Sequence, residues 1–260
     1  MRLNLASITF FMLAMTACGE EATTAGEGGE ANTGPAQVTN SINVMDWADG
    51  SPIAGAQLCP NVDGQDCQIT NVNGNASFTF TANEGDQLQL RVSKAGYFSF
   101  IIETECVGLV DGGMIETSWF MSTTAVITEM QSIAGTAPAA DKGQATVQVF
   151  GPADNMDTRY PLAGVVVAFD GNAEMGPKHF NPTEDFAVSG PFSSGNVTTE
   201  AGWSAFFNVD PGAVDVTATL DGYVCGPGHA GLPSTSGTVS GNVEANHITY
   251  LTVFCDFGSK

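Results

Sequence analysis

The chain has 260 residues, enough for one large or two small domains, and 43% of them are hydrophobic. Its 28 acidic residues outnumber 7 basic ones, giving a formal net charge of −21 at pH 7. This balance excludes nucleic acid as a partner, because few cations are available to neutralise a phosphate backbone. It also repels anionic headgroups, so membrane attachment has to come from lipid and not from a basic patch. Glycine is abundant and long helix-favouring stretches are missing, which favours β-strands joined by turns.

The N-terminus, residues 1–17, has the pattern of a secretory signal peptide. Arg2 precedes an apolar run over residues 5–14, which is too short to span a bilayer. The run leads to Met15-Thr16-Ala17-Cys18, which resembles a bacterial lipobox because small residues precede the cysteine. The resemblance implies cleavage before Cys18 and acyl chains on it, which together give stable anchoring. An ordinary signal peptide, with Cys18 incidental, is the alternative.

The segment after the cleavage site predicts a flexible tether over residues 18–38. Residues 19–37 include no Leu, Ile, Val or aromatic residue, so they cannot bury enough apolar surface to offset the entropy of ordering. Residue 19 is Gly rather than Asp. By resemblance to the sorting rules of diderm bacteria, this implies the outer membrane, with the protein facing the periplasm or the exterior.

One pattern occurs twice in the rest of the chain, which predicts two copies of one domain. Its parts are Pro52-Ile53-Ala54-Gly55-Ala56 and Pro161-Leu162-Ala163-Gly164-Val165, Thr70-x-x-x-Gly74-x-x-x-Phe78 and Thr198-x-x-x-Gly202-x-x-x-Phe206, and Gly96-Tyr97 and Gly222-Tyr223. Alternation over residues 41–45 and 145–150 predicts half-buried strands. Asn73-Gly74 and its counterpart predict hairpin turns. We expect the ring of each Gly-Tyr pair to pack across a core.

These motifs resemble the carboxypeptidase regulatory-like, or transthyretin-like, domain. The resemblance implies an all-β fold with two Greek-key β-sandwiches, over residues 39–132 and 144–260, joined by a linker over 133–143. Members of this family serve as accessory, adhesive or spacer modules on secreted proteins, and few are enzymes. The sequence therefore predicts a non-catalytic envelope protein that serves as a binding, adhesion or spacer module, with a surface glycan or protein as the candidate ligand. A purely structural envelope protein is one alternative.

The second copy carries about 19 more residues than the first, because Pro52 and Gly74 are 22 positions apart whereas Pro161 and Gly202 are 41 apart. The extra residues predict a long irregular loop over about 171–195. Long loops on a rigid scaffold often carry binding sites. Tyr160, His179, Phe180 and Trp203 are the candidate binding residues. The alternative is a structural insert that covers a sheet edge.

Five cysteines follow Cys18, in a compartment that permits disulfides. The spacing favours Cys59–Cys67, which would close a small ring, and Cys225–Cys255, which would fasten the last strand. Cys106 is left over. It is either free or displaces one member of the first pair, and spacing leaves this open.

No catalytic motif, cofactor site or metal site is expected from the sequence. The three histidines, His179, His229 and His247, all lie in the second copy and could together bind zinc, so a metal-dependent enzyme or a metal-binding domain there is the other alternative. Acidic residues at 63–66 and 154–157 are candidate calcium ligands, although neither has EF-hand spacing and both fit ordinary turns.

Overall fold

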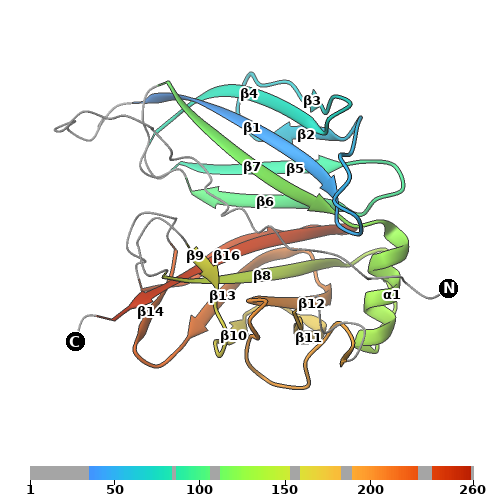
Figure 1. Cartoon of the computed structure of the whole chain (residues 1–260), viewed down its shortest axis with the longest axis vertical. Coiled ribbons are helices and arrows are strands. Elements are labelled where there is room, and N and C mark those ends of the chain that lie inside the picture. Colours follow the sequence, from blue (N-terminus) through green and yellow to red (C-terminus); the bar gives the residue numbers. More distant parts are fainter. Residues whose placement is uncertain are drawn as a thin grey trace. The chain divides into compact units, whose positions relative to one another are not determined.

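The computed structural model describes residues 35–83, 86–105, 112–152, 159–182, 189–227 and 236–258. The chain divides after Met121 into two compact units, which we call the first unit and the second unit. Both are built almost wholly of β-strands, so the all-β fold predicted from the sequence is confirmed (Figure 1). Cys18, Cys106, His229 and the acidic stretch 154–157 lie outside the described residues.

The first unit is a sandwich of two sheets. One sheet has the order β4-β1-β7, with β1 antiparallel to β4 and parallel to β7. In the other sheet β2 pairs with β3 and β5, and β5 pairs with β6, all antiparallel. The strands are β1 (Ala36–Asp46), β2 (Gln57–Pro60), β3 (Gln68–Ile69), β4 (Asn75–Ala82), β5 (Gln87–Ser93), β6 (Ser99–Glu105) and β7 (Gly113–Met121).

The alternation along these strands decides which face of each sheet is buried. On β4, Phe78, Phe80 and Ala82 are buried, and the residues between them are exposed. On β5, Leu88, Leu90 and Val92 are buried in the same alternating way. Because side chains on a strand point to opposite faces in turn, each sheet presents one apolar face to the core.

The second unit repeats this arrangement. Its first sheet has the order β11-β12-β8-β16, with β9 paired to β8 and β14 to β16, and its second sheet has the order β10-β13-β15. The strands are β8 (Gly143–Pro152), β9 (Arg159–Pro161), β10 (Val166–Phe169), β11 (Ala173–His179), β12 (Trp203–Val209), β13 (Gly212–Thr219), β14 (Tyr223–Gly226), β15 (Val239–Val243) and β16 (His247–Phe257). Valines from both sheets, including Val147, Val167 and Val216, form one core cluster.

Strand pairing shows that the sequence repeat is a structural repeat. In the second unit β8 pairs antiparallel with β12 and parallel with β16. In the first unit β1 pairs in the same way with β4 and β7. The central strand of the other sheet, β5 or β13, also lies between two antiparallel neighbours in each unit.

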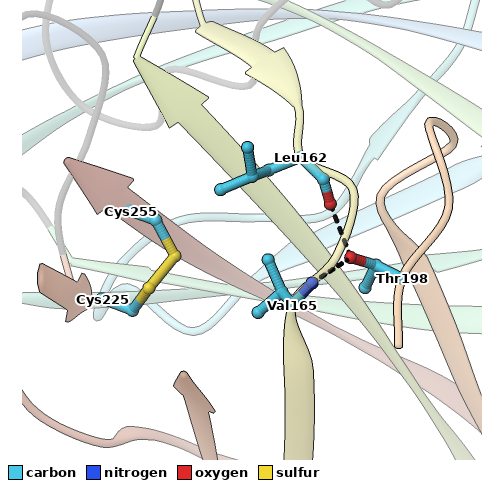
Figure 2. Close-up of a disulfide and its surroundings, with 5 residues drawn as sticks. All are labelled: Leu162, Val165, Thr198, Cys225 and Cys255. Carbon is cyan, nitrogen blue, oxygen red and sulfur yellow. Dashed lines mark hydrogen bonds between the residues drawn. A yellow bond between two sulfur atoms is a disulfide. The ribbon is translucent and has the colours of Figure 1, made fainter. Parts of the chain in front are cut away.

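A buried threonine hydroxyl holds the turn of the Pro-x-Ala-Gly motif in each unit. Thr198 Oγ1 donates to the carbonyl of Leu162 at 2.6 Å and accepts from the amide of Val165 at 3.0 Å (Figure 2). In the first unit, Thr70 Oγ1 donates to the Ile53 carbonyl at 2.6 Å and accepts from the Ala56 amide at 2.8 Å. We call this arrangement the threonine clamp.

Steric crowding explains why the hairpin position of the repeated pattern is a glycine in both units. Gly74 and Gly202 adopt φ of +77° and +66°, a region that favours glycine. A Cβ atom would lie 2.5 Å from the Val44 carbonyl oxygen at Gly74, and 2.7 Å from that of Val149 at Gly202. Those two valines also donate their amides to the carbonyls of the same glycines, at 2.9 Å and 2.8 Å. The hairpin turn is therefore packed directly against the first strand of each unit.

The boundary between the units differs from the predicted one. Residues 122–134, expected in the first sandwich or the linker, belong to the second unit and include helix α1 (Thr124–Ala134). The helix begins at the Thr123 cap and ends at Gly135, whose φ is +97°. Its buried residues, Ile127, Gln131 and Ala134, recur at helical spacing. Strand β1 also begins at residue 36, so the last residues of the expected tether are part of the sandwich, with Ala36 buried.

The ring of Tyr223 packs against the core of the second unit, as expected, whereas that of Tyr97 differs from expectation. Tyr97 is half-buried, and its hydroxyl donates to Asp46 Oδ2 at 2.7 Å instead of lying in an apolar core. This hydrogen bond raises the pKa of Tyr97 to about 12. Tyr223 contacts the ring of Phe257, with centroids 5.0 Å apart.

We predict that Thr198→Val destabilises the protein, because it keeps the side chain's shape and deprives the Leu162 carbonyl and the Val165 amide of their buried partner. The expected loss is roughly 2 kcal/mol in the free energy of unfolding, measured by denaturant titration of the full chain. The control is Thr217→Val on the exposed side of β13, which should change stability by less than about 0.5 kcal/mol. Equal effects of the two substitutions would contradict the role of the clamp.

Candidate functional site

Part of the 171–195 insert is a strand and not an irregular loop. Residues 173–179 form β11, which pairs antiparallel with β12 at the edge of the first sheet of the second unit. The register shifts between Met175 and Lys178. Residues 183–188 lie outside the described part of the chain. The described part of the insert thus extends the sheet, as the alternative of a structural insert at a sheet edge predicts.

The aromatic side chains of the insert pack on one another. The Phe180 and Phe192 rings have centroids 5.0 Å apart, and the Phe192 and Phe207 centroids are 5.9 Å apart. Met175, Phe180 and Phe192 pack against a small buried cluster of Ala134, Ala205 and Phe207. Helix α1 and the insert therefore share one apolar cluster on β12, and Phe180 is half-buried within it.

Backbone hydrogen bonds fix the insert to its own unit. The Phe180 amide donates to the Trp203 carbonyl at 3.0 Å, and the Ser193 amide donates to the His179 carbonyl at 2.8 Å. Thr199 Oγ1 donates to the Phe180 carbonyl. Asn181 Nδ2 donates to the Gly190 carbonyl at 2.8 Å. This bond links the two described segments of the insert.

His179 is fully buried, with 0% of its surface exposed. Its Nδ1 lies 2.8 Å from Ser204 Oγ, on the neighbouring strand. Burial lowers the pKa of His179, and a backbone hydrogen bond with Asn196 opposes this effect. His179 was predicted as a binding residue, but its burial places it out of reach of a ligand. It is a polar core residue at the root of the insert.

The other candidate binding residues are divided between two places. Trp203 is half-buried opposite Gln148 of β8, and its ring meets Tyr250 edge-on with centroids 5.9 Å apart. Tyr160 lies on β9 opposite Gly151 of β8, with 59% of its surface exposed. The structure therefore brings His179, Phe180 and Trp203 together where β11 meets β12. Tyr160 is the most accessible of the four.

Asn208 is a polar centre that sequence reasoning missed. It is buried with φ of +51°, unusual for a residue other than glycine. Its Nδ2 lies 2.9 Å from Thr136 Oγ1, 2.7 Å from the Ala137 carbonyl and 2.6 Å from Glu174 Oε2. The bond to Asn208 lowers the pKa of Glu174. One side chain thus joins the segment after α1 to the insert, although no spacing or motif marks it in the sequence.

Asp210, two residues after Asn208, belongs to an ion pair. Lys142 Nζ pairs with Asp210, which also accepts a hydrogen bond from Asn172 Nδ2. The Lys142 bond is the larger cause that lowers the pKa of Asp210. Because both partners are partly exposed, we assign the pair a positioning role and little net stabilisation.

The described histidines do not form a metal site. His179 bonds Ser204, and His247 Nδ1 lies 2.9 Å from the Ala245 carbonyl. In the part of the chain that the structure describes, no group of three or more His, Cys, Asp or Glu is placed to hold a metal ion. Asp63 and Asp66 lie in the exposed loop between β2 and β3.

Both disulfides expected from the sequence are present. Cys59 pairs with Cys67 across eight positions, and Cys225 pairs with Cys255 across thirty. Cys225 and Cys255 lie directly opposite each other on β14 and β16, so this bond fastens the last strand (Figure 2). One disulfide closes the β2–β3 loop of the first unit, and the other lies in the core of the second.

Comparisons with known proteins leave the family open. No protein-family model matches the chain, and no curated protein matches it. Similar solved structures include a minor pilin of Streptococcus agalactiae, 16% identical, covering 86% of this chain and 97% of the pilin with a TM-score of 0.30. The Bacillus anthracis TIE protein is 13% identical, with a TM-score of 0.28; the match covers 85% of this chain and only 34% of that one. The shaft pilin of Lactobacillus rhamnosus GG is 9% identical, with 87% and 99% covered and a TM-score of 0.24.

These TM-scores are too low to support a conclusion about family or function. The resemblance to carboxypeptidase regulatory-like domains accordingly stays a prediction. Within the described residues, no helix has both the length and the apolar character needed to cross a membrane.

We predict that burial of neutral His179 makes the second unit sensitive to mild acid. Its pKa in the folded chain is lowered, so below about pH 6.5 the unfolded chain takes up a proton that the folded chain resists. The free energy of unfolding should therefore fall between pH 7 and pH 5, and the slope due to His179 should fade above about pH 7.5. Denaturant titrations at each pH measure this slope.

The control for this prediction is His179→Gln, which removes the titrating ring and leaves the acidic residues to titrate as before. The substituted protein should show a shallower fall between pH 7 and pH 5. An identical pH dependence in both proteins would show that His179 is not the group responsible.

Proposed function

We propose that this chain is a non-catalytic lipoprotein of the bacterial outer membrane whose two sandwiches serve as binding, adhesion or spacing modules. Acyl chains on Cys18 hold the mature N-terminus in the membrane, and the acidic segment that follows links it to the first unit. The negative charge of the chain supports lipid over a basic patch as the means of attachment.

The pair of disulfides, one in each unit, is the observation that carries this proposal. Disulfides persist in secreted and envelope proteins and are rare in a reducing cytosol. They therefore support export of the chain, independently of the apolar N-terminal run and the residues before Cys18. Both kinds of observation favour the same compartment.

A rigid scaffold with exposed aromatic groups supports a binding role. Tyr160 on β9 and Phe257 at the end of β16 expose 59% and 69% of their surfaces. Aromatic rings at a surface can stack on sugars or peptides, with an apolar face and, in tyrosine, a polar hydroxyl. Tyr160 is the residue of the predicted set that we retain for this role.

We predict that Cys18→Ala releases the protein from the membrane. The full chain, with its own signal sequence, would be expressed in a diderm bacterium and fractionated on a density gradient. The unsubstituted chain should sediment with the outer membrane, and Cys18→Ala should appear in the soluble periplasmic fraction because it has no thiol to acylate. The mass of the N-terminal peptide should show the added acyl chains.

The matched control is Cys106→Ala, which removes a cysteine elsewhere and should leave the chain in the membrane fraction. If Cys18→Ala remains in the outer membrane, or the N-terminal peptide has no acyl chains, the proposed anchoring is wrong. A pull-down from envelope extracts distinguishes a binding module from a spacer. A binding module should capture a glycan or protein and lose it on Tyr160→Ala, whereas a spacer should capture none.

A further inference from the structure

We propose that an open hollow in the first unit binds a saccharide that carries a carboxylate. This proposal rests on the proposed binding function, for which it names a ligand. Its test does not depend on membrane anchoring. The hollow has a volume of about 550 Å³, within the range of sites for small ligands. It lies where β2, β3 and the end of β5 meet, with Ile69 and Ala95 among its walls.

Polar groups of suitable chemistry line this hollow. Lys94, Gln57, Ser93 and Ser99 contribute an ammonium group, an amide and two hydroxyls, and the described residues of the lining include no carboxylate. Lys94 Nζ lies 3.4 Å from the Gly55 carbonyl oxygen, a long hydrogen bond. The ammonium group therefore keeps donors for a ligand. A cation with several neutral hydrogen-bonding groups suits one negative charge on a polyhydroxylated molecule.

The second unit shows that the fold itself does not require a lysine at this turn. Lys94 and Leu220 occupy the same turn, because each accepts the amide of the tyrosine three positions later, at 3.0 Å and 3.1 Å. A Cβ atom built on Gly55 would lie 2.9 Å from Lys94 Nζ, and one on Gly164 would lie 3.8 Å from Leu220 Cδ1. The two side chains therefore reach toward the same place on the repeated turn.

Gln57 and Ser99 also have apolar counterparts, whereas the counterpart of Ser93 is Thr219, which again carries a hydroxyl. By the same repeat, Val166 stands in the place of Gln57, and the disulfide-bonded Cys225 stands in the place of Ser99. Leu220 packs against the core of the second unit. Apolar residues at these positions are thus compatible with the fold. The polar residues of the first unit therefore need an explanation other than folding. Recognition of a polar, anionic ligand supplies one.

The charge of the chain makes this cation unusual. Lys94 is one of only 7 basic residues in a chain with 28 acidic ones. Lys142 is paired with Asp210. A lysine in a hollow whose described walls carry no carboxylate therefore offers a selective site for a carboxylate ligand, whereas much of the remaining surface repels one. A single ammonium group acts as a point charge, which suits a monoanion such as a uronic acid.

The test is a titration of the full mature chain in detergent, followed by NMR or calorimetry at fixed ionic strength. The probes are a glucuronate-containing disaccharide, the matched neutral glucose disaccharide and glucose 6-phosphate. We expect the glucuronate sugar to bind at least tenfold more tightly than the other two. The second unit shows that leucine fits the same turn, so Lys94→Leu should fold normally and bind the glucuronate sugar at least tenfold more weakly.

Two further variants keep the result interpretable. Lys178→Leu removes a positive charge from β11 and should bind as the unsubstituted chain does. Lys94→Gln should lose affinity like Lys94→Leu, even if the leucine variant loses stability. The proposal is overturned if the glucuronate sugar does not bind, if Lys94 variants bind it normally, or if the neutral or phosphorylated sugar binds equally well. None of these outcomes bears on membrane anchoring, which the Cys18 variant tests separately.

Discussion

The threonine clamp is the interaction on which both units depend. One threonine hydroxyl bonds both a carbonyl and an amide of a sharp turn. The backbone of the same threonine also bonds this turn. Without it, the turn would bury two unpaired backbone groups, which is costly in a low-dielectric core. The same turn lies against the hairpin glycine, because a Cβ atom built on Gly74 would lie 3.2 Å from Pro52 Cβ and one on Gly202 would lie 2.8 Å from Pro161 Cβ.

The two units use one framework in different ways. The second adds β11 at a sheet edge and packs the insert's aromatics against a cluster that includes Ala134 of helix α1, and apolar Leu220 lies where the first unit has Lys94. The first has no such insert and keeps an open hollow with polar walls. Because the clamp and the core strands are retained in both, these differences alter the surface without altering the fold. A duplicated sandwich can thus assign packing to one copy and recognition to the other.

Covalent and polar constraints make the scaffold rigid. Each unit has its own disulfide, and Asn208 joins three segments of the second unit through a single amide. The acidic surface keeps such a scaffold soluble and repels other anions, so the few cations have more influence on recognition than their number suggests. Rigidity also lowers the entropy lost when a preformed surface binds its ligand.

The sequence by itself determined the all-β class and the repeat and favoured both disulfide pairings, because strand alternation, turn glycines and cysteine spacing are local signals. Spacing left open whether Cys106 displaces a member of the first pair, and the structure decided for Cys59–Cys67. The sequence did not reveal helix α1, whose three buried positions include the polar Gln131, nor the centre at Asn208, whose partners lie far away along the chain. Tertiary structure alone decided that His179 is buried and that Lys94 lines a hollow, because exposure depends on which segments cover a residue and not on its neighbours in sequence.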